Sequence, residues 1–266
     1  MYSSIRSYTF TKDTITSESS RLILEIALEI VINGASNTMI MFTPVGTQEL
    51  VTGFIFTEGL IDGVSEILEC SISSSEGLDG DQVIEAQVKI SSENPNLSGV
   101  QTKRVSYSSC GICGKENFYD MKKGLGRVKS RHRFSIEVLE KLPAKLQEHQ
   151  PLYQMTGGAH AAVLFSSEGN PLLLYEDMGR HNALDKVIGA TLIQGISCED
   201  KILLSSGRAS LEMMLKTARA GIPVFIAMSR PTSKAVEAAK FYNITLIDMA
   251  KNSNRVYSHA RRIEGF

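Results

Sequence analysis

The second half of the chain alternates short apolar runs with amphipathic stretches, and this alternation restricts the fold more than any other feature. Strands are expected at 161–165, 172–175, 201–204, 224–228 and 245–247, and helices at 182–190, 210–220 and 234–241. The turn-forming residues 166–170 join the first two strands as a hairpin. We therefore predict an α/β fold, with a layered α/β domain over 135–266 whose sheet starts as a hairpin and then becomes parallel.

The region before this domain predicts a smaller α+β domain over 1–134, so the protein is α+β overall. We expect a loose or edge segment over 1–20, a hairpin turning at Asn33-Gly34, and a helix over 48–58. Short strands are expected at 65–67 and 83–90. At the start of the second domain, Ser135 is expected to cap a helix that Pro143 kinks or restarts.

Composition excludes several function classes. The chain has 266 residues, 42% of them hydrophobic, and a net charge of −1, which argues against a general nucleic-acid binder. No apolar run approaches the roughly 20 residues of a membrane span, and residues 1–13 lack the apolar core of a signal peptide. With four cysteines, this composition predicts a cytoplasmic protein with reduced thiols and no membrane partner.

Two cysteines, Cys110 and Cys113, stand in a glycine-rich loop inside a strongly basic segment. From Lys103 to Arg133 there are nine Lys or Arg residues and two Asp or Glu residues, a net charge of +7. Positive neighbours lower the pKa of a thiol and attract anions. The pattern indicates reactive thiols that meet an anionic partner.

The spacing of these two cysteines is compatible with three kinds of site. A structural zinc site needs two more ligands, and the sequence holds no second cysteine pair. A thioredoxin-like redox pair lacks the βαβ unit that precedes it in such proteins. A thiol that carries sulfur or another group covalently fits the basic surroundings. The sequence does not separate the last two, and we expect no resident metal.

Glycine-rich and polar loops follow successive strands of the second domain. The loop 156–160 brings His160 to a strand start, where it is either a ligand contact or part of a tight turn. Three later strand–helix junctions each hold an arginine and hydroxyl or acidic side chains: Arg180, Arg208 and Arg230. Helix N-termini with arginines suit phosphates. The spacings of phosphate-binding and dinucleotide-binding glycine loops are absent, so an ordinary ATPase or dehydrogenase is not expected.

Several of these segments occur in the order seen in one family. They are Phe54-Ile55-Phe56-Thr57-Glu58-Gly59, Ser109-Cys110-Gly111-Ile112-Cys113-Gly114, Thr156-Gly157-Gly158-Ala159-His160-Ala161, Glu176-Asp177-Met178-Gly179-Arg180-His181-Asn182, and Ser206-Gly207-Arg208-Ala209-Ser210. In this respect the chain resembles the FdhD family of formate dehydrogenase accessory sulfurtransferases, over nearly all of its length after residue 20. The resemblance implies a cytidine-deaminase-like fold for the second half.

The resemblance also implies a function and a site. It implies a sulfur carrier that accepts sulfur as a persulfide on Cys110, with Cys113 as partner, from a cysteine desulfurase. The sulfur would pass to the molybdenum cofactor, bis-molybdopterin guanine dinucleotide, before its insertion into formate dehydrogenase apoenzyme. The cofactor-binding segment maps onto Met249, Ala250, Lys251, Asn252, Ser253 and Asn254, and Arg180 and Arg208 are expected to bind the same guanine nucleotide-type ligand.

The family pattern has Gly-Phe where this chain has Asp248-Met249. A true deaminase is disfavoured, because the chain has no H-x-E motif. The alternative function is a non-catalytic cofactor chaperone whose cysteines are structural or regulatory. We also expect a homodimer.

Overall fold

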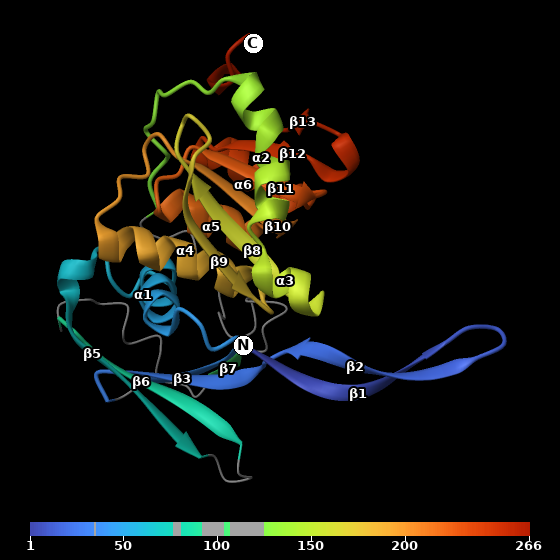
Figure 1. The fold of residues 1–266 in the computed structure, drawn as a ribbon. Coiled ribbons are helices and arrows are strands. Elements are labelled where there is room, and N and C mark those ends of the chain that lie inside the picture. Colours follow the sequence, from blue (N-terminus) through green and yellow to red (C-terminus); the bar gives the residue numbers. More distant parts are fainter. Residues whose placement is uncertain (35, 77–80, 92–103, 107–124) are drawn as a thin grey trace.

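The computed structural model describes the chain except for residues 35, 77–80, 92–103 and 107–124. It is a mixed α/β protein with two sheets and an additional hairpin, which confirms the predicted mixed class (Figure 1). The likeness of the second half to cytidine deaminases stays a prediction, as does the domain boundary after residue 134. None of the described helices has the length and apolar character that crossing a membrane requires.

The first sheet has five strands, in the order β5 (Ile67–Glu76), β6 (Gln82–Ile90), β3 (Ile26–Ile32), β4 (Ser36–Phe42) and β7 (Arg104–Ser106). β3 and β4 form the expected hairpin, and Asn33 and Gly34 have the positive φ angles, 51° and 68°, that such a turn needs. The strand expected at 65–67 is wrong: a 3₁₀ helix, η1 (Val64–Glu66), precedes the much longer β5.

The second sheet has six strands, in the order β13 (Arg255–Val256), β12 (Thr245–Asp248), β11 (Val224–Ser229), β10 (Ile202–Arg208), β8 (His160–Phe165) and β9 (Pro171–Asp177). β8 is antiparallel to β9 and β10, whereas β10, β11 and β12 are parallel. This confirms a hairpin followed by parallel strands.

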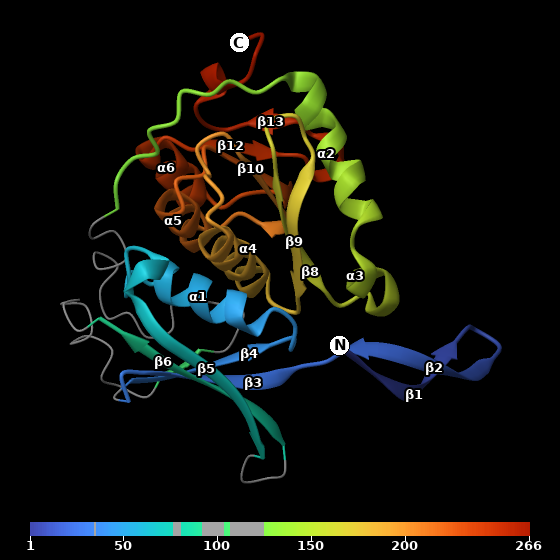
Figure 2. The same cartoon turned by 60° about the vertical axis from the view of Figure 1, so that its left-hand side comes forward.

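Helices cover both faces of the second sheet (Figures 1 and 2). On one face lie α4 (Arg180–Gln194), α5 (Leu211–Arg219) and α6 (Ser233–Tyr242). On the other face lies α2 (Ile136–Glu148), followed by α3 (Pro151–Thr156). The central strands are therefore buried on both faces, which explains their nearly continuous apolar sequence.

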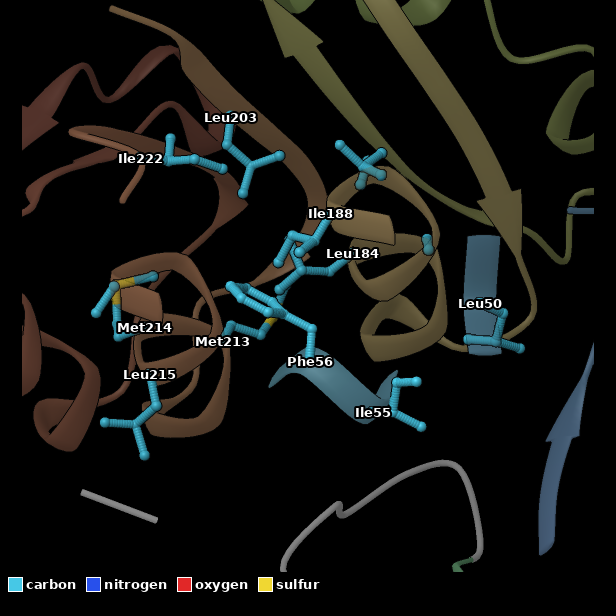
Figure 3. Packing of buried hydrophobic residues seen from close by; sticks show 14 of the residues in the cluster. Leu50, Ile55, Phe56, Leu184, Ile188, Leu203, Met213, Met214, Leu215 and Ile222 are labelled. Atoms are coloured by element: carbon cyan, nitrogen blue, oxygen red, sulfur yellow. The ribbon is translucent and has the colours of Figure 1, made fainter. Parts of the chain in front are cut away.

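The two sheets are joined by α1 (Thr47–Thr57), which lies between the first sheet and α4 (Figure 2). Two glycines let these helices touch through their backbones. A Cβ atom on Gly53 would lie 1.9 Å from the Asp185 carbonyl oxygen, and one on Gly189 would lie 1.9 Å from that of Glu49. Figure 3 shows the apolar packing beside this contact, where Phe56 of α1 lies near residues of α4 and α5.

Two expectations for connecting segments are wrong in part. Residues 1–20 fall in a regular two-stranded hairpin, β1 (Tyr2–Phe10) with β2 (Ile15–Ile23), so they form edge strands rather than a loose segment. Pro143 does not restart α2, because Leu139, Leu142 and Leu146 are all buried against the sheet and hold the helix on either side of the proline. Ser135 stands at the N-cap as expected, without a side-chain capping hydrogen bond.

Candidate functional site

The strand ends of the second sheet bring the predicted polar loops to one edge. β9, β10, β11 and β12 all end there, and β8 begins there, with His160 opposite Asp177 in the ladder. Arg208 is paired in register with Ser229, and Ala227 with Asp248. We call this side of the sheet the strand-end edge. It lies where open α/β sheets bind ligands.

The three predicted arginines lie along the strand-end edge. Arg180 is the first residue of α4 and is half-buried, whereas Arg208 and Arg230 are exposed. Within the described part of the chain, none of the three forms an ion pair or a side-chain hydrogen bond. Arginines without carboxylate partners leave a positive edge suited to an anion.

A glycine positions the first of these arginines. A Cβ atom on Gly207 would lie 2.8 Å from Arg180 Cδ and 3.1 Å from Arg180 Cβ. The Arg180 side chain therefore lies directly across the β10 end, and a larger residue at position 207 would displace it.

The hydroxyl groups predicted at this edge have defined roles. Ser210 and Thr232 cap α5 and α6, where their side chains accept hydrogen bonds from Met213 N and Ala235 N. Ser206 Oγ accepts from Ala161 N at 2.9 Å and lies 3.2 Å from His160 Nδ1. These contacts fix the β8 start to the β10 end, so the edge is a rigid platform.

His181, which the sequence places in the 176–182 segment without assigning it a role of its own, has a strongly lowered pKa. It is 7% exposed, and its Nε2 lies 3.3 Å from Ser210 Oγ and 3.7 Å from Glu212 Oε2. Burial, with the positive charges of Lys216 and Arg180, lowers the pKa of His181 to about 3. The imidazole is therefore neutral at physiological pH.

Buried ion pairs hold the elements around this edge. Lys186 Nζ lies 2.6 Å from Asp177 Oδ2 and also donates to the carbonyl oxygen of Thr43, which joins α4, β9 and the end of β4. Lys216 Nζ lies 2.5 Å from Asp185 Oδ2, which joins α5 to α4. Sequence reasoning gave these lysines no role, because charged residues in helices are usually solvated.

The predicted cofactor-binding segment 249–254 also reaches the strand-end edge. Met249 N donates to the carbonyl oxygen of Ala227 at the end of β11, and Ser253 Oγ donates to that of Asp248. Lys251 and Asn254 are exposed and have the left-handed φ angles 50° and 42°. The Met249 side chain is buried among apolar residues and is therefore not available to a ligand. Ala250 begins the 3₁₀ helix η4 (Ala250–Asn252).

Cys110 and Cys113 lie outside the described residues. The chain enters their segment from β7, which is parallel to β4 and ends at Ser106. The end of β4 is bound to the start of α4, because Thr43 N donates to Asp177 Oδ2 and Asn182 Nδ2 donates to Met41 O. No group of three His, Cys, Asp or Glu side chains suited to a metal ion exists among the described residues.

The fold and this edge define an α/β protein with arginines along one edge of its second sheet. Comparison with known proteins is more specific: the model of the FdhD/NarQ family matches residues 23–264. Relatives named "Sulfur carrier protein FdhD" include one from Sulfurisphaera tokodaii, 39% identical over 85% of this chain and 83% of its own. Another, from Mycolicibacterium paratuberculosis, is 38% identical over 91% of both chains. This chain therefore belongs to the FdhD/NarQ family.

A solved structure shares the fold. The crystal structure of a protein from Desulfotalea psychrophila, assigned as a formate dehydrogenase accessory protein, aligns with a TM-score of 0.76. The alignment covers 98% of this chain and 99% of the other, at 21% sequence identity. The arrangement of both sheets is thus similar to that of an experimentally determined protein.

Proposed function

We propose that this protein is a sulfur carrier that accepts sulfur as a persulfide on Cys110 from a cysteine desulfurase. It delivers that sulfur to the molybdenum cofactor, in the bis-molybdopterin guanine dinucleotide form, before formate dehydrogenase receives it. Family membership and the sulfur-carrier names of relatives support the role. The proposed class of activity is sulfurtransferase, and the cofactor is its substrate.

The observation that carries the proposal is the strand-end edge with its three arginines, which have no ion-pair partner in the described part of the chain. A guanine dinucleotide brings diphosphate groups, and arginines bind phosphate oxygens through paired, charge-assisted hydrogen bonds. The 249–254 segment lies at the same edge, beside the end of β11. Arg180, Arg208 and this segment are thus close enough to serve one ligand.

The proposed chemistry needs a thiolate and a partner thiol. The Cys110 thiolate attacks the outer sulfur of the desulfurase persulfide and releases the desulfurase cysteine as a thiolate. When the Cys113 thiolate then attacks the Cys110 sulfur, a Cys110–Cys113 disulfide forms and the outer sulfur leaves as hydrosulfide. The two electrons that reduce the sulfur come from the cysteine pair.

The described ends of the cysteine segment agree with this arrangement. Ser106 pairs opposite Ile40 on β4, near the start of α4. Cys110 is the fourth residue after Ser106, and four chain steps span at most about 14 Å.

Sulfur loading is the direct test. The protein is incubated with a cysteine desulfurase and cysteine, and its intact mass is measured. Cys110→Ala should prevent the gain of one sulfur atom, whereas Cys198→Ala, a matched change at a thiol whose pKa burial raises, should leave it intact. A Cys110→Ala protein that still gains sulfur would overturn the assignment.

Ligand specificity tests the second half of the proposal. Calorimetry should show guanosine diphosphate binding more tightly than adenosine diphosphate, and Arg208→Ala should weaken binding by about tenfold or more. Lys251→Ala should weaken it less, and Arg261→Ala, at an exposed arginine outside the basic segment, should have no effect. Equal binding of both nucleotides would contradict a guanine-specific site.

These outcomes also separate the carrier from a cofactor chaperone, which would bind the nucleotide without loading sulfur. Formate dehydrogenase apoenzyme is the proposed final partner. The homodimer and the cytoplasmic location remain predictions.

A further inference from the structure

Among the residues that the structure describes, two enclosed nitrogen atoms at the start of α4 have no hydrogen-bond partner: Arg180 Nε and His181 Nδ1. A buried donor without an acceptor is destabilising, so such groups are rare and need an explanation. These two belong to consecutive residues in the first turn of a 15-residue helix. Both residues therefore stand at the N-terminal end of α4, beside the strand-end edge.

The contact between His181 and Ser210 is compatible with a proton on His181 Nδ1. Ser210 Oγ accepts from Met213 N at 3.4 Å and can donate its own proton to His181 Nε2, 3.3 Å away. A neutral imidazole that accepts at Nε2 carries its proton on Nδ1. The ring is kept neutral by burial and by Lys216 and Arg180. In this tautomer His181 Nδ1 is an N–H donor.

The nearby carboxylates are already engaged. Asp177 Oδ1 accepts from Gly179 N and Asn182 Nδ2, and Asp177 Oδ2 accepts from Thr43 N and Lys186 Nζ. Glu212 pairs with Lys216 at 3.7 Å.

The helix start itself also lacks an acceptor. The N-cap of α4 is Gly179, which provides no side-chain cap for the first-turn N–H groups. Side chains and backbone thus both present hydrogen-bond donors at this helix start, and an external anion would accept from them.

We propose that the first turn of α4 binds one tetrahedral oxyanion of the phosphate class, held by the Arg180 guanidinium and the His181 Nδ1–H. The helix N-terminus adds its partial positive charge. Gly207 leaves the space through which Arg180 crosses the β10 end. This subsite deepens the proposed function and rests on it, because it places one phosphate of the nucleotide-type ligand.

The test uses inorganic phosphate, with sulfate as a second tetrahedral anion, so that neither guanine nor sulfur transfer is needed. Calorimetry measures binding to the parent protein and to two His181 variants. In His181→Asn the amide nitrogen takes the Nδ1 position, and in His181→Gln it takes the Nε2 position beside Ser210. We expect His181→Asn to bind phosphate nearly as the parent does, and His181→Gln to bind about tenfold more weakly.

Matched arginine variants complete the experiment. Arg180→Ala should weaken phosphate binding by about tenfold, whereas Arg261→Ala, which removes the same charge from an exposed site outside the basic segment, should leave it unchanged. Circular dichroism confirms that each variant is folded. No phosphate binding by the parent, or equal binding by both His181 variants, overturns the subsite. If the protein binds phosphate but does not prefer guanosine diphosphate to adenosine diphosphate, the proposed function is contradicted and the subsite still stands.

Discussion

At the scale of single residues, His181 links the site to the stability of the fold. Its pKa in the folded protein is about 3, below the 6.5 of an unfolded chain. The unfolded state therefore binds the extra proton first as the pH falls, and stability decreases from pH 6.5 towards 3. Between pH 7 and pH 5 this histidine alone should remove about 2 kcal/mol of unfolding free energy.

Urea denaturation at the two pH values measures this effect. The His181→Gln variant has no titrating ring, so the difference between pH 7 and pH 5 should be smaller by that amount than in the parent. An unchanged difference would show that His181 titrates normally in the folded protein.

The buried ion pair between Lys216 and Asp185 leads to a second prediction at this scale. Lys216→Met leaves the Asp185 carboxylate, which is almost completely buried, without its cation. Removing one member of a buried pair costs about 3–5 kcal/mol. Lys201→Met breaks the pair with the more exposed Asp200 and should cost less than about 1 kcal/mol. Chemical denaturation of both variants compares the two losses, and similar values would contradict the burial argument.

At the scale of elements, the contact between α1 and α4 depends on two glycines. In Gly53→Ala or Gly189→Ala the new methyl group meets a backbone carbonyl at 1.9 Å, and backbone atoms cannot rotate away. Each change should destabilise the protein by about 3 kcal/mol. Gly126→Ala is the control, because a Cβ there meets nothing within 4 Å. Thermal unfolding that ranks Gly126→Ala equal to the other two would show that α1 and α4 do not pack this closely.

Elements buried on both faces are the ones that the sequence predicts best. β10, β11 and β12 show as apolar runs with polar ends, and this is why the convergence of Arg180, Arg208 and Arg230 follows from parallel topology. β1 and β2 are not predicted as strands. Their apolar residues, such as Phe10 and Ile15, stand among serines and threonines and are exposed, so they contribute nothing to a hydrophobic core.

The site residues divide in the same way. Arginines at strand ends can be recognised in the sequence, because a positive charge next to a helix start generally favours anion binding. The roles of Lys186, Lys216 and His181 cannot be recognised there. Their partners come from other elements, such as Thr43 at the end of β4 and Ser210 at the start of α5. Only the tertiary packing makes these polar side chains buried.

At the scale of the whole molecule, the first sheet and the second share one continuous core. Residues of β3, α1, α4 and α5 belong to a single buried cluster. Figure 3 shows the part of it that α1, α4 and α5 contribute. The backbone contact between Gly53 and α4 lies inside it. Opening either sheet would expose the apolar faces of α1 and α4, so local opening of one sheet is unfavourable.

We therefore expect both sheets to unfold in one cooperative step. Native-state hydrogen exchange, followed by mass spectrometry, should give the same opening free energy for peptides from β3 and from β10. Gly189→Ala should lower both values equally, although it lies in neither sheet, while Gly126→Ala should lower neither. If β3 opens at markedly lower free energy than β10, or if Gly189→Ala lowers only one of them, residues 1–134 and 135–266 unfold independently and the shared core does not couple them.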